Sequence, residues 1–415
     1  MYLELIWSQW KDIIAFSDLN RGNLPLLRTL EIISSETYTS RGGRNVVVAP
    51  SLPFFRGSIN LESFTFHSWR LSFLSHFVFP NLTTFKLLSR PAEECSASCL
   101  LNFLEASPTL QTIEMTISAR LVLTSVPQEM VVALPNVETF SLHIAGRSAA
   151  NVYDIAAHIS CPCAKYTSLS HDVYESYTND ELEAFPTPDL LNTIIHRYTE
   201  SPIEEIELKI KPSEGDKDTD CSLTFRSSNA TVVELSFKVT NTGLDEAELN
   251  VPRTEMGWRF FSQALTTIQH RPLLSHVKRL HIEHRAVVSN TYEMLCIAAK
   301  VPVLFDSLGP LDKLRIRGCD LHIFFDAFLE NPRLCNSKPV VFPQVKKLVV
   351  LHPLMEIDET ECTKAIVGLA RLQHSRGIPF ELVKVRMWNL PAGMAEELEQ
   401  WVNVVDCDEE EEEYV

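Results

Sequence analysis

The sequence predicts an α/β fold in which short parallel strands and helices alternate and stack into a solenoid. Three observations favour this fold. The segment Phe79-Pro-Asn-Leu-Thr-Thr-Phe-Lys-Leu87 places apolar residues as L-x-x-L-x-L after a turn-forming proline, and similar segments begin at Leu24, Leu134 and Phe342. Between these segments the apolar spacing changes from two to about 3.6 residues, as when a strand leads into a helix. No glycine-rich nucleotide-binding motif follows a strand, which disfavours a doubly wound sheet.

The first apolar position of each unit serves as a marker of the repeat. The intervals between successive markers range from 21 to 45 residues, whereas leucine-rich repeats usually span about 20 to 29. We therefore predict a leucine-rich-repeat solenoid, or horseshoe, of about 11–12 irregular repeats, with parallel strands on the concave face and helices on the convex face. The markers are Leu27, Leu61, Leu82, Leu110, Val137, Ala164, Ile203, Val232, Val277, Leu311, Val345 and Leu382.

Helices are expected where apolar residues recur three or four positions apart. The spacing predicts helices over 98–106, 189–198, 256–269, 320–330, 362–375 and 394–405, with Asp189 as the cap of the second. Two polar segments, 41–44 and 211–220, are expected to be loops. The solenoid is expected to cover residues 1–405, and residues 406–415 to form an acidic, disordered tail.

Charge and hydropathy exclude several classes of partner. The formal net charge of −17 disfavours binding to nucleic acid or to an anionic membrane surface. No run of about 18 apolar residues would span a membrane, and residues 1–10 lack the basic and small-residue features of a secretory signal. Ten scattered cysteines fit reduced thiols. A cytoplasmic or nuclear protein is expected.

Residues that alternate with the apolar strand positions would line the concave face. They change along the chain from hydroxyl-rich (Thr29, Ser63, Thr65, Thr84, Thr112, Thr139, Ser141) through acidic (Glu205, Glu207, Glu234) to basic. The basic end is the predicted partner-binding site, and it comprises Arg279, His281, Lys313, Arg315, Arg317, Lys347, Lys384, Arg386 and Trp388. Arginine presents paired donors to carboxylates and phosphates, so an acidic or phosphorylated protein partner would fit. Two alternatives stay open: a merely solvated basic face, or a face that the acidic tail from Asp406 to Glu413 covers.

Sequence motifs for catalysis are missing. The chain has no G-x-S-x-G, no H-E-x-x-H and no phosphate-binding glycine loop, and it has only 13 glycines. His281 and His284 fall in or just after a predicted strand, where residues three apart point to opposite faces, so they are not expected to bind a metal. We predict that the protein is not an enzyme and that it holds no cofactor.

The repeat units resemble the leucine-rich-repeat region of fungal F-box proteins, notably the large basidiomycete set. The resemblance rests on the F/L-P-x-L-x-x-L-x-L units and on the helix L-L-N-F-L-E-A at Leu100–Ala106 before S-P-T-L-Q-T-I-E-M. The segments 8–13 (S-Q-W-K-D-I) and 369–380 (L-A-R-L-Q-H-S-R-G-I-P-F) are similar to the entry and the last helix of that region. The helical F-box itself is not visible.

The resemblance implies a substrate receptor. In that family the F-box docks on the Skp adaptor of a cullin-type (SCF) ubiquitin ligase, while the repeats hold the target protein. Because no F-box is visible, a Skp adaptor is expected as a partner only if an F-box is present. The alternatives are a free-standing leucine-rich-repeat scaffold or a truncated copy with no ligase link, and, from a different class, an enzyme whose site is assembled from distant residues.

Overall fold

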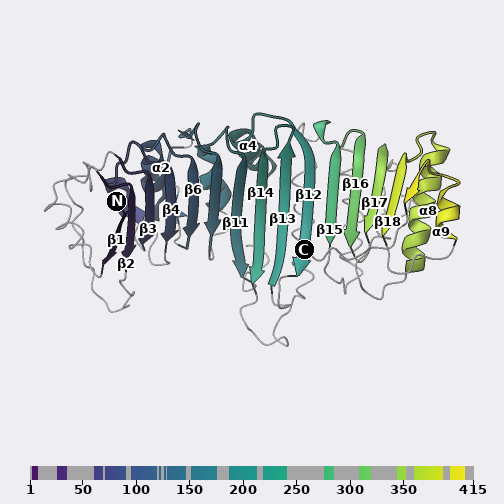
Figure 1. Ribbon diagram of the computed structural model, residues 1–415, viewed down its shortest axis with the longest axis horizontal. Coiled ribbons are helices and arrows are strands. Elements are labelled where there is room, and N and C mark those ends of the chain that lie inside the picture. Colours follow the sequence, from purple (N-terminus) through teal and green to yellow (C-terminus); the bar gives the residue numbers. More distant parts are fainter. Residues whose placement is uncertain are drawn as a thin grey trace, which may run out of the picture. The chain divides into compact units, whose positions relative to one another are not determined.

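The structure is a computed structural model, and it describes residues 2–7, 26–34, 60–68, 71–89, 95–118, 121–122, 126–127, 129–145, 151–174, 187–212, 218–240, 275–284, 308–318, 344–351, 359–386 and 393–406. The fold is mixed α/β, with a large and mostly parallel sheet (Figure 1). The chain forms two compact units. Unit 1 comprises 1–174, 180–200 and 231–235, and unit 2 comprises 175–179, 201–230 and 236–415.

Unit 1 is built on parallel strands paired in the order β1-β2-β3-β4-β6-β9-β11. These strands are β1 (Tyr2–Trp7), β2 (Thr29–Ser34), β3 (Ser63–Ser68), β4 (Thr84–Ser89), β6 (Thr112–Ile117), β9 (Thr139–Ile144) and β11 (Tyr166–Tyr174). Two short parallel pairs accompany them, β5 (Cys95–Ser96) with β7 (Leu121–Val122) and β8 (Val132–Ala133) with β10 (Ile159–Ser160). The helices are η1 (Leu71–His76), α2 (Ala97–Glu105), α3 (Asn151–Ala157) and α4 (Pro188–Tyr198).

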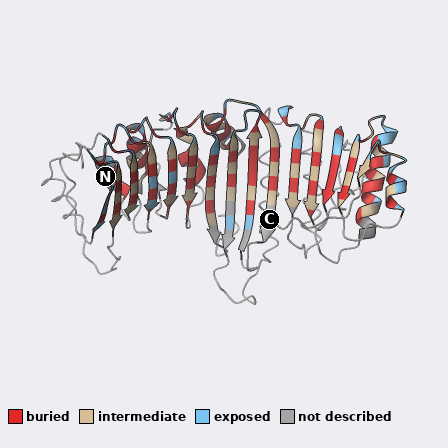
Figure 2. Cartoon of the chain, viewed as in Figure 1, coloured by how far each residue is buried: buried red, intermediate tan, exposed pale blue. Residues whose placement is uncertain are grey.

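The core of unit 1 lies between its strands and its helices. Alternate strand residues are buried, which Figure 2 shows as bands along each strand. Phe85 of β4 meets Phe103 of α2 with ring centroids 4.6 Å apart, and Phe140 of β9 meets Tyr198 of α4 at 5.3 Å. Each such buried aromatic side chain contributes about 1.5–3 kcal/mol. The helices therefore cover the face of the sheet that bears the apolar residues.

Unit 2 combines one hairpin with a parallel sheet. Strands β12 (Ile203–Pro212) and β13 (Asp218–Ser227) pair antiparallel, and β12 then leads the parallel order β12-β15-β16-β17-β18-β19. The further strands are β15 (Arg279–His284), β16 (Leu311–Gly318), β17 (Val345–Leu351), β18 (Leu382–Arg386) and β19 (Val405–Asp406), and the helices are α8 (Glu359–Ser375) and α9 (Met394–Leu398). Strand β14 (Val232–Thr240) gives its first residues to unit 1 and its last to unit 2.

The predicted strands agree closely with the structure. At all twelve markers a strand begins at the marker or two residues after it. The helices predicted over 98–106, 189–198 and 362–375 correspond to α2, α4 and α8. Those predicted over 256–269 and 320–330, and the loop predicted at 41–44, lie outside the described residues.

Three local predictions were wrong. Residues 211–212 end β12 and residues 218–220 begin β13, because apolar residues alternate along both strands; residues 213–217 of the predicted loop lie outside the described residues. The last helix ends at Leu398 instead of 405, and β19 follows. The cap of α4 is Thr187, whose hydroxyl accepts a hydrogen bond from the Leu190 amide at 3.4 Å, while Asp189 lies in the first turn.

Candidate partner-binding face of unit 2

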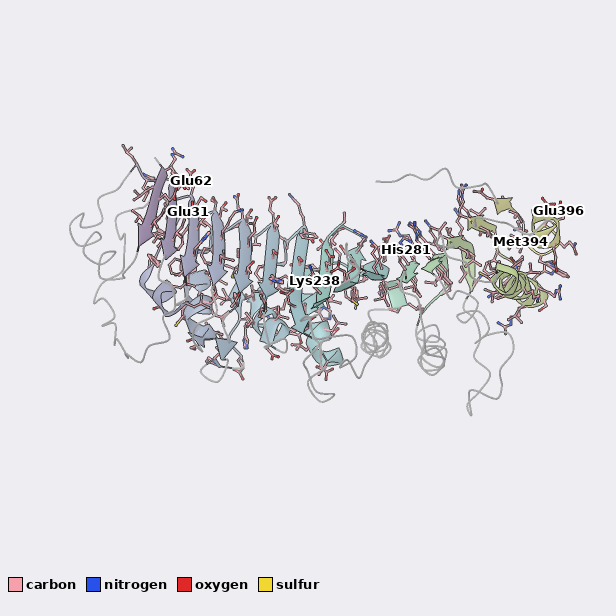
Figure 3. All side chains as sticks on the ribbon, turned by 90° about the horizontal axis from the view of Figure 1, so that it is seen from below. Glu31, Glu62, Lys238, His281, Met394 and Glu396 are labelled. Atoms are coloured by element: carbon pink, nitrogen blue, oxygen red, sulfur yellow. The ribbon has the colours of Figure 1, made fainter. Side chains whose placement is uncertain are left out.

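One face of the unit 2 sheet carries charged side chains. The apolar residues of the strands, such as Leu280, Ile282, Leu314 and Ile316, are buried in the core. Because side chains alternate along a strand, the residues between them lie on the opposite face, which we call the open face. Figure 3 shows nitrogen-bearing side chains gathered beside His281 on this part of the sheet. All eight predicted strand residues, from Arg279 to Arg386, occupy the expected alternate positions.

Parallel pairing aligns these side chains in rows across the strands. In the first row Glu205, Arg279, Lys313 and Lys347 are successive partners. In the second row the partners are Glu207, His281, Arg315, Val349, Lys384 and Asp406. Neighbouring strands lie about 4.8 Å apart, so adjacent members of a row are close enough to interact directly. The rows begin with acidic residues and continue with basic ones.

The acidic beginning of the rows is neutralised within the unit. Arg226 of β13 donates to Glu205 and to Glu207, each at 3.1 Å, and Arg279 pairs with Glu205 at 2.8 Å. Burial opposes ionisation of Glu207, but the hydrogen bonds and charges of Lys209 and Arg226 outweigh it and lower the pKa of that carboxyl. This part of the face has little charge left for a partner.

The middle of the rows is not neutralised. Lys313, Arg315 and Lys347, which we call the cationic patch, have no carboxylate within 4 Å among the residues that the structure describes. Burial and then the charge of Arg315 lower the pKa of Lys313, with further contributions from Arg279 and Lys347, and these effects outweigh the opposing attraction of Glu205. Like charges on adjacent strands repel, so the three cations destabilise one another.

Two apolar side chains lie on the open face beside the cationic patch. Val349 is the row partner of Arg315 and Lys384, and Leu351 is the row partner of Arg317 and Arg386. Their exposed fractions are 9% and 6%, so the neighbouring side chains largely cover them. The aliphatic parts of arginine and lysine commonly lie over apolar surface while their charged ends stay in water. The site therefore combines an apolar floor with a cationic rim.

The far end of the second row is closed by an acidic residue. Asp406 of β19 accepts a hydrogen bond from Lys384 Nζ at 2.7 Å, and the two residues are register partners. Their side chains are 28% and 32% exposed. Asp406 was expected to belong to the disordered tail, whereas it forms part of the sheet because Val405 and Asp406 extend the parallel pairing by one strand.

The predicted site residues lie in several different environments. Lys313, Arg315 and Lys347 form the cationic patch. Arg279, Arg317 and Lys384 form ion pairs, with Glu205, Glu283 and Asp406 respectively, at 2.8, 4.0 and 2.7 Å. His281 lies 3.9 Å from Glu205, and burial lowers its pKa, so at neutral pH it adds no positive charge. Arg386 belongs to a third row, in which Glu283, Arg317, Leu351 and Arg386 are successive partners. Trp388 lies outside the described residues.

Some members of the site were missed from the sequence. Val349 and Leu351 belong to the run Leu348-Val-Val-Leu351, in which apolar residues do not alternate with polar ones. A continuous apolar run indicates a strand that is covered on both faces, and this signal could have identified them. Glu283 stands two residues after His281, so the strand period alone places it on the open face.

The open face of unit 1 has a different character. Its predicted hydroxyl residues Thr29, Ser63, Thr84, Thr112 and Thr139 are successive row partners on β2, β3, β4, β6 and β9. Charged residues of this face pair with one another: Lys86 pairs with its row partner Glu114 at 2.7 Å, and His67 lies 3.7 Å from Glu31. This face offers hydroxyl groups and paired charges rather than an excess of one sign.

The part of the chain that the structure describes offers little to a metal ion or a membrane. No group of three or more histidine, cysteine or acidic side chains there could hold a metal ion. No helix in the described ranges is long and apolar enough to cross a membrane. Cys161, Cys163 and Cys221 are free thiols. Trp401 lies against Arg371 and His374, with the guanidinium carbon 5.3 Å from the ring centroid, so it acts in packing.

Comparison of the chain with known protein families, with curated proteins and with solved structures finds no match.

Proposed function

We propose that the chain is a non-catalytic protein-recognition module of the leucine-rich-repeat type, and that the cationic patch binds an acidic or phosphorylated segment of a protein partner. The observation that carries the proposal is the set of three adjacent cations without a carboxylate partner in the described chain. A solvated basic face would be expected to spread such charges or to pair them, as this sheet does with Arg279 and Arg317. A bound anion would relieve the repulsion.

The arrangement favours a peptide over a single small anion. Cations on β16 and β17 flank Val349, whose neighbour Leu351 extends the apolar floor. An acidic segment that also carries an apolar side chain would use both features, because burial of that side chain adds affinity to the charge contacts. The recurring strand motif and the parallel order within each unit support a leucine-rich-repeat solenoid, which usually presents such a sheet face to proteins.

The resemblance to F-box proteins extends the proposal to a role in protein turnover. On this view the chain is the target-holding part of a substrate receptor of a cullin-type ubiquitin ligase, and it works in the cytoplasm or nucleus. The alternative within the same class is a free-standing scaffold. Co-purification from native cells separates the two: a recovered Skp adaptor and cullin would support the ligase role, and recovery of targets without either would contradict it.

The binding proposal is tested with one substitution and a matched control. Arg315→Glu reverses a charge in the cationic patch, whereas Arg376→Glu makes the same change at an exposed position just after α8. Both proteins and the unmodified chain would be applied to an array of acidic and phosphorylated peptides. We expect Arg315→Glu to reduce the affinity for the best-binding peptides at least about tenfold. Arg376→Glu should leave that affinity within about twofold of the unmodified chain. Equal effects of the two substitutions would contradict the proposal.

A further inference from the structure

The described chain ends on the open face, close to the cationic patch. β19 adds to the edge of the sheet beside β18, and Asp406 places its carboxylate 2.7 Å from Lys384 Nζ. Lys384 is separated from Arg315 in its row only by Val349. The last described residue therefore lies in the row that contains Arg315, three strand spacings from it.

The sequence that follows is rich in acidic residues. Residues 408–413 are Asp-Glu-Glu-Glu-Glu-Glu, a run of six carboxylates that we call the acidic segment. We propose that the acidic segment is an intramolecular ligand of the cationic patch and competes there with the partner. This inference rests on the proposed function, since it concerns the regulation of the same site.

The chain is long enough for this contact. From Asp406 to Arg315 the row crosses three strand spacings, a distance of roughly 14 Å at about 4.8 Å each. The residues from 407 to 413 span up to roughly 24 Å when extended, at about 3.4 Å per residue. The segment can therefore reach Arg315 and Lys347 with length to spare for a change of direction after β19.

Charge directs the segment to the patch and not beyond it. Lys384 is already paired with Asp406, so the next cations along the rows are Lys347 and Arg315. Farther along the same rows, Glu205 and Glu207 are paired with Arg226 and Arg279, so that part of the face offers little positive charge to the acidic segment. Lys313, Arg315 and Lys347 are thus cations that the segment can neutralise, and Arg386, two residues after Lys384 on the same face, is another.

Covalent attachment makes even a weak contact effective. A short flexible connection holds a ligand at an effective concentration of about 1 mM. If the acidic segment alone binds the patch with a dissociation constant of about 0.1 mM, attachment would reduce the affinity for an external acidic peptide about tenfold. The contact would weaken as salt is added, because both ligands depend on the same exposed charges.

The contact is tested directly by zero-length cross-linking of the full chain with a carbodiimide, which joins lysine amines to nearby carboxylates. Cross-linking of Lys384 to Asp406 serves as the internal control, since those atoms are 2.7 Å apart. We expect additional links from Lys313 or Lys347 to residues 408–413. An equal mixture of unlabelled and 15N-labelled protein distinguishes links within one chain from links between copies. Recovery of the control link alone, or of links only between copies, would overturn the proposal.

The competition is tested with a fluorescein-labelled octaglutamate peptide. A variant with Asp408→Asn and Glu409 to Glu413 all replaced by glutamine should bind this peptide about tenfold more tightly than the unmodified chain at low salt. Adding Arg315→Glu to this variant should abolish the increase in affinity for the peptide. Equal, measurable binding of the peptide by the unmodified chain and by the variant with neutral residues 408–413 would overturn the inference. The proposed function would then still stand. Intramolecular cross-links without peptide binding by either protein would overturn the proposed partner class and leave the tail contact established.

Discussion

A buried histidine in unit 1 provides a prediction whose magnitude follows from the structure. The side chain of His171 on β11 is fully buried, and its ring meets that of Tyr153 on α3 edge-to-face, with centroids 5.8 Å apart. Burial lowers its pKa from about 6.5 to about 3, and this effect exceeds the opposing attraction of Asp172. The native state therefore keeps His171 neutral at pH values where the unfolded chain would protonate it.

The sign and size of the effect follow from proton linkage. Below about pH 6.5 the unfolded state binds one more proton at this residue than the native state, so stability falls as the pH falls. The loss is about 1.4 kcal/mol at pH 5.5 and about 2.7 kcal/mol at pH 4.5, and it levels off near pH 3. Above about pH 6.5 the residue contributes no pH dependence.

The substitution His171→Phe removes the titrating group and keeps a ring beside Tyr153. The free energy of opening of β11 would be measured by hydrogen exchange at pH 7.5, 6.5, 5.5 and 4.5, with correction for the intrinsic exchange rates. We expect the unmodified protein to lose about 2.7 kcal/mol more than the variant between pH 7.5 and 4.5. The exposed His196, replaced by glutamine, is the control. The same pH slope in the unmodified protein and in His171→Phe would refute the argument.

Three further predictions concern packing, a turn and the edge of the sheet. Phe64 contacts five other phenylalanine rings, so Phe64→Ala should destabilise unit 1 by about 3–5 kcal/mol in urea denaturation, and a loss below about 1 kcal/mol would contradict the packing. Ala230 has a φ of 62°, so Ala230→Gly should raise stability by about 0.5–1 kcal/mol in the same assay, and a decrease would argue against that conformation. Lys384→Ala removes an ion-pair partner of Asp406 and should speed hydrogen exchange of β19, with β16 unchanged; unaltered exchange would mean that this ion pair does not hold β19.

The sequence by itself located most of the strands of the large sheet, although β1, β13 and β19 carry no marker and were not predicted. Apolar side chains must alternate wherever one face of a strand is buried, so the L-x-x-L-x-L pattern located strands at all twelve markers. The same period placed Lys313, Arg315 and Lys347 on the face opposite the core. Local patterns also predicted α2 and α8, since a helical spacing of apolar residues is a property of a few consecutive turns.

Only the tertiary structure decided which of those charges are available. Arg279 and Arg317 lie at the same alternating strand positions as Arg315. The parallel register, however, brings Glu205 and Glu283 beside them from neighbouring strands. Register depends on how strands that are distant in the sequence are aligned. An ion pair forms only when that alignment brings the two charged atoms within a few ångströms of each other. For the same reason the Asp406 contact with Lys384 could not be read from the chain, although the acidity of the residues after it could.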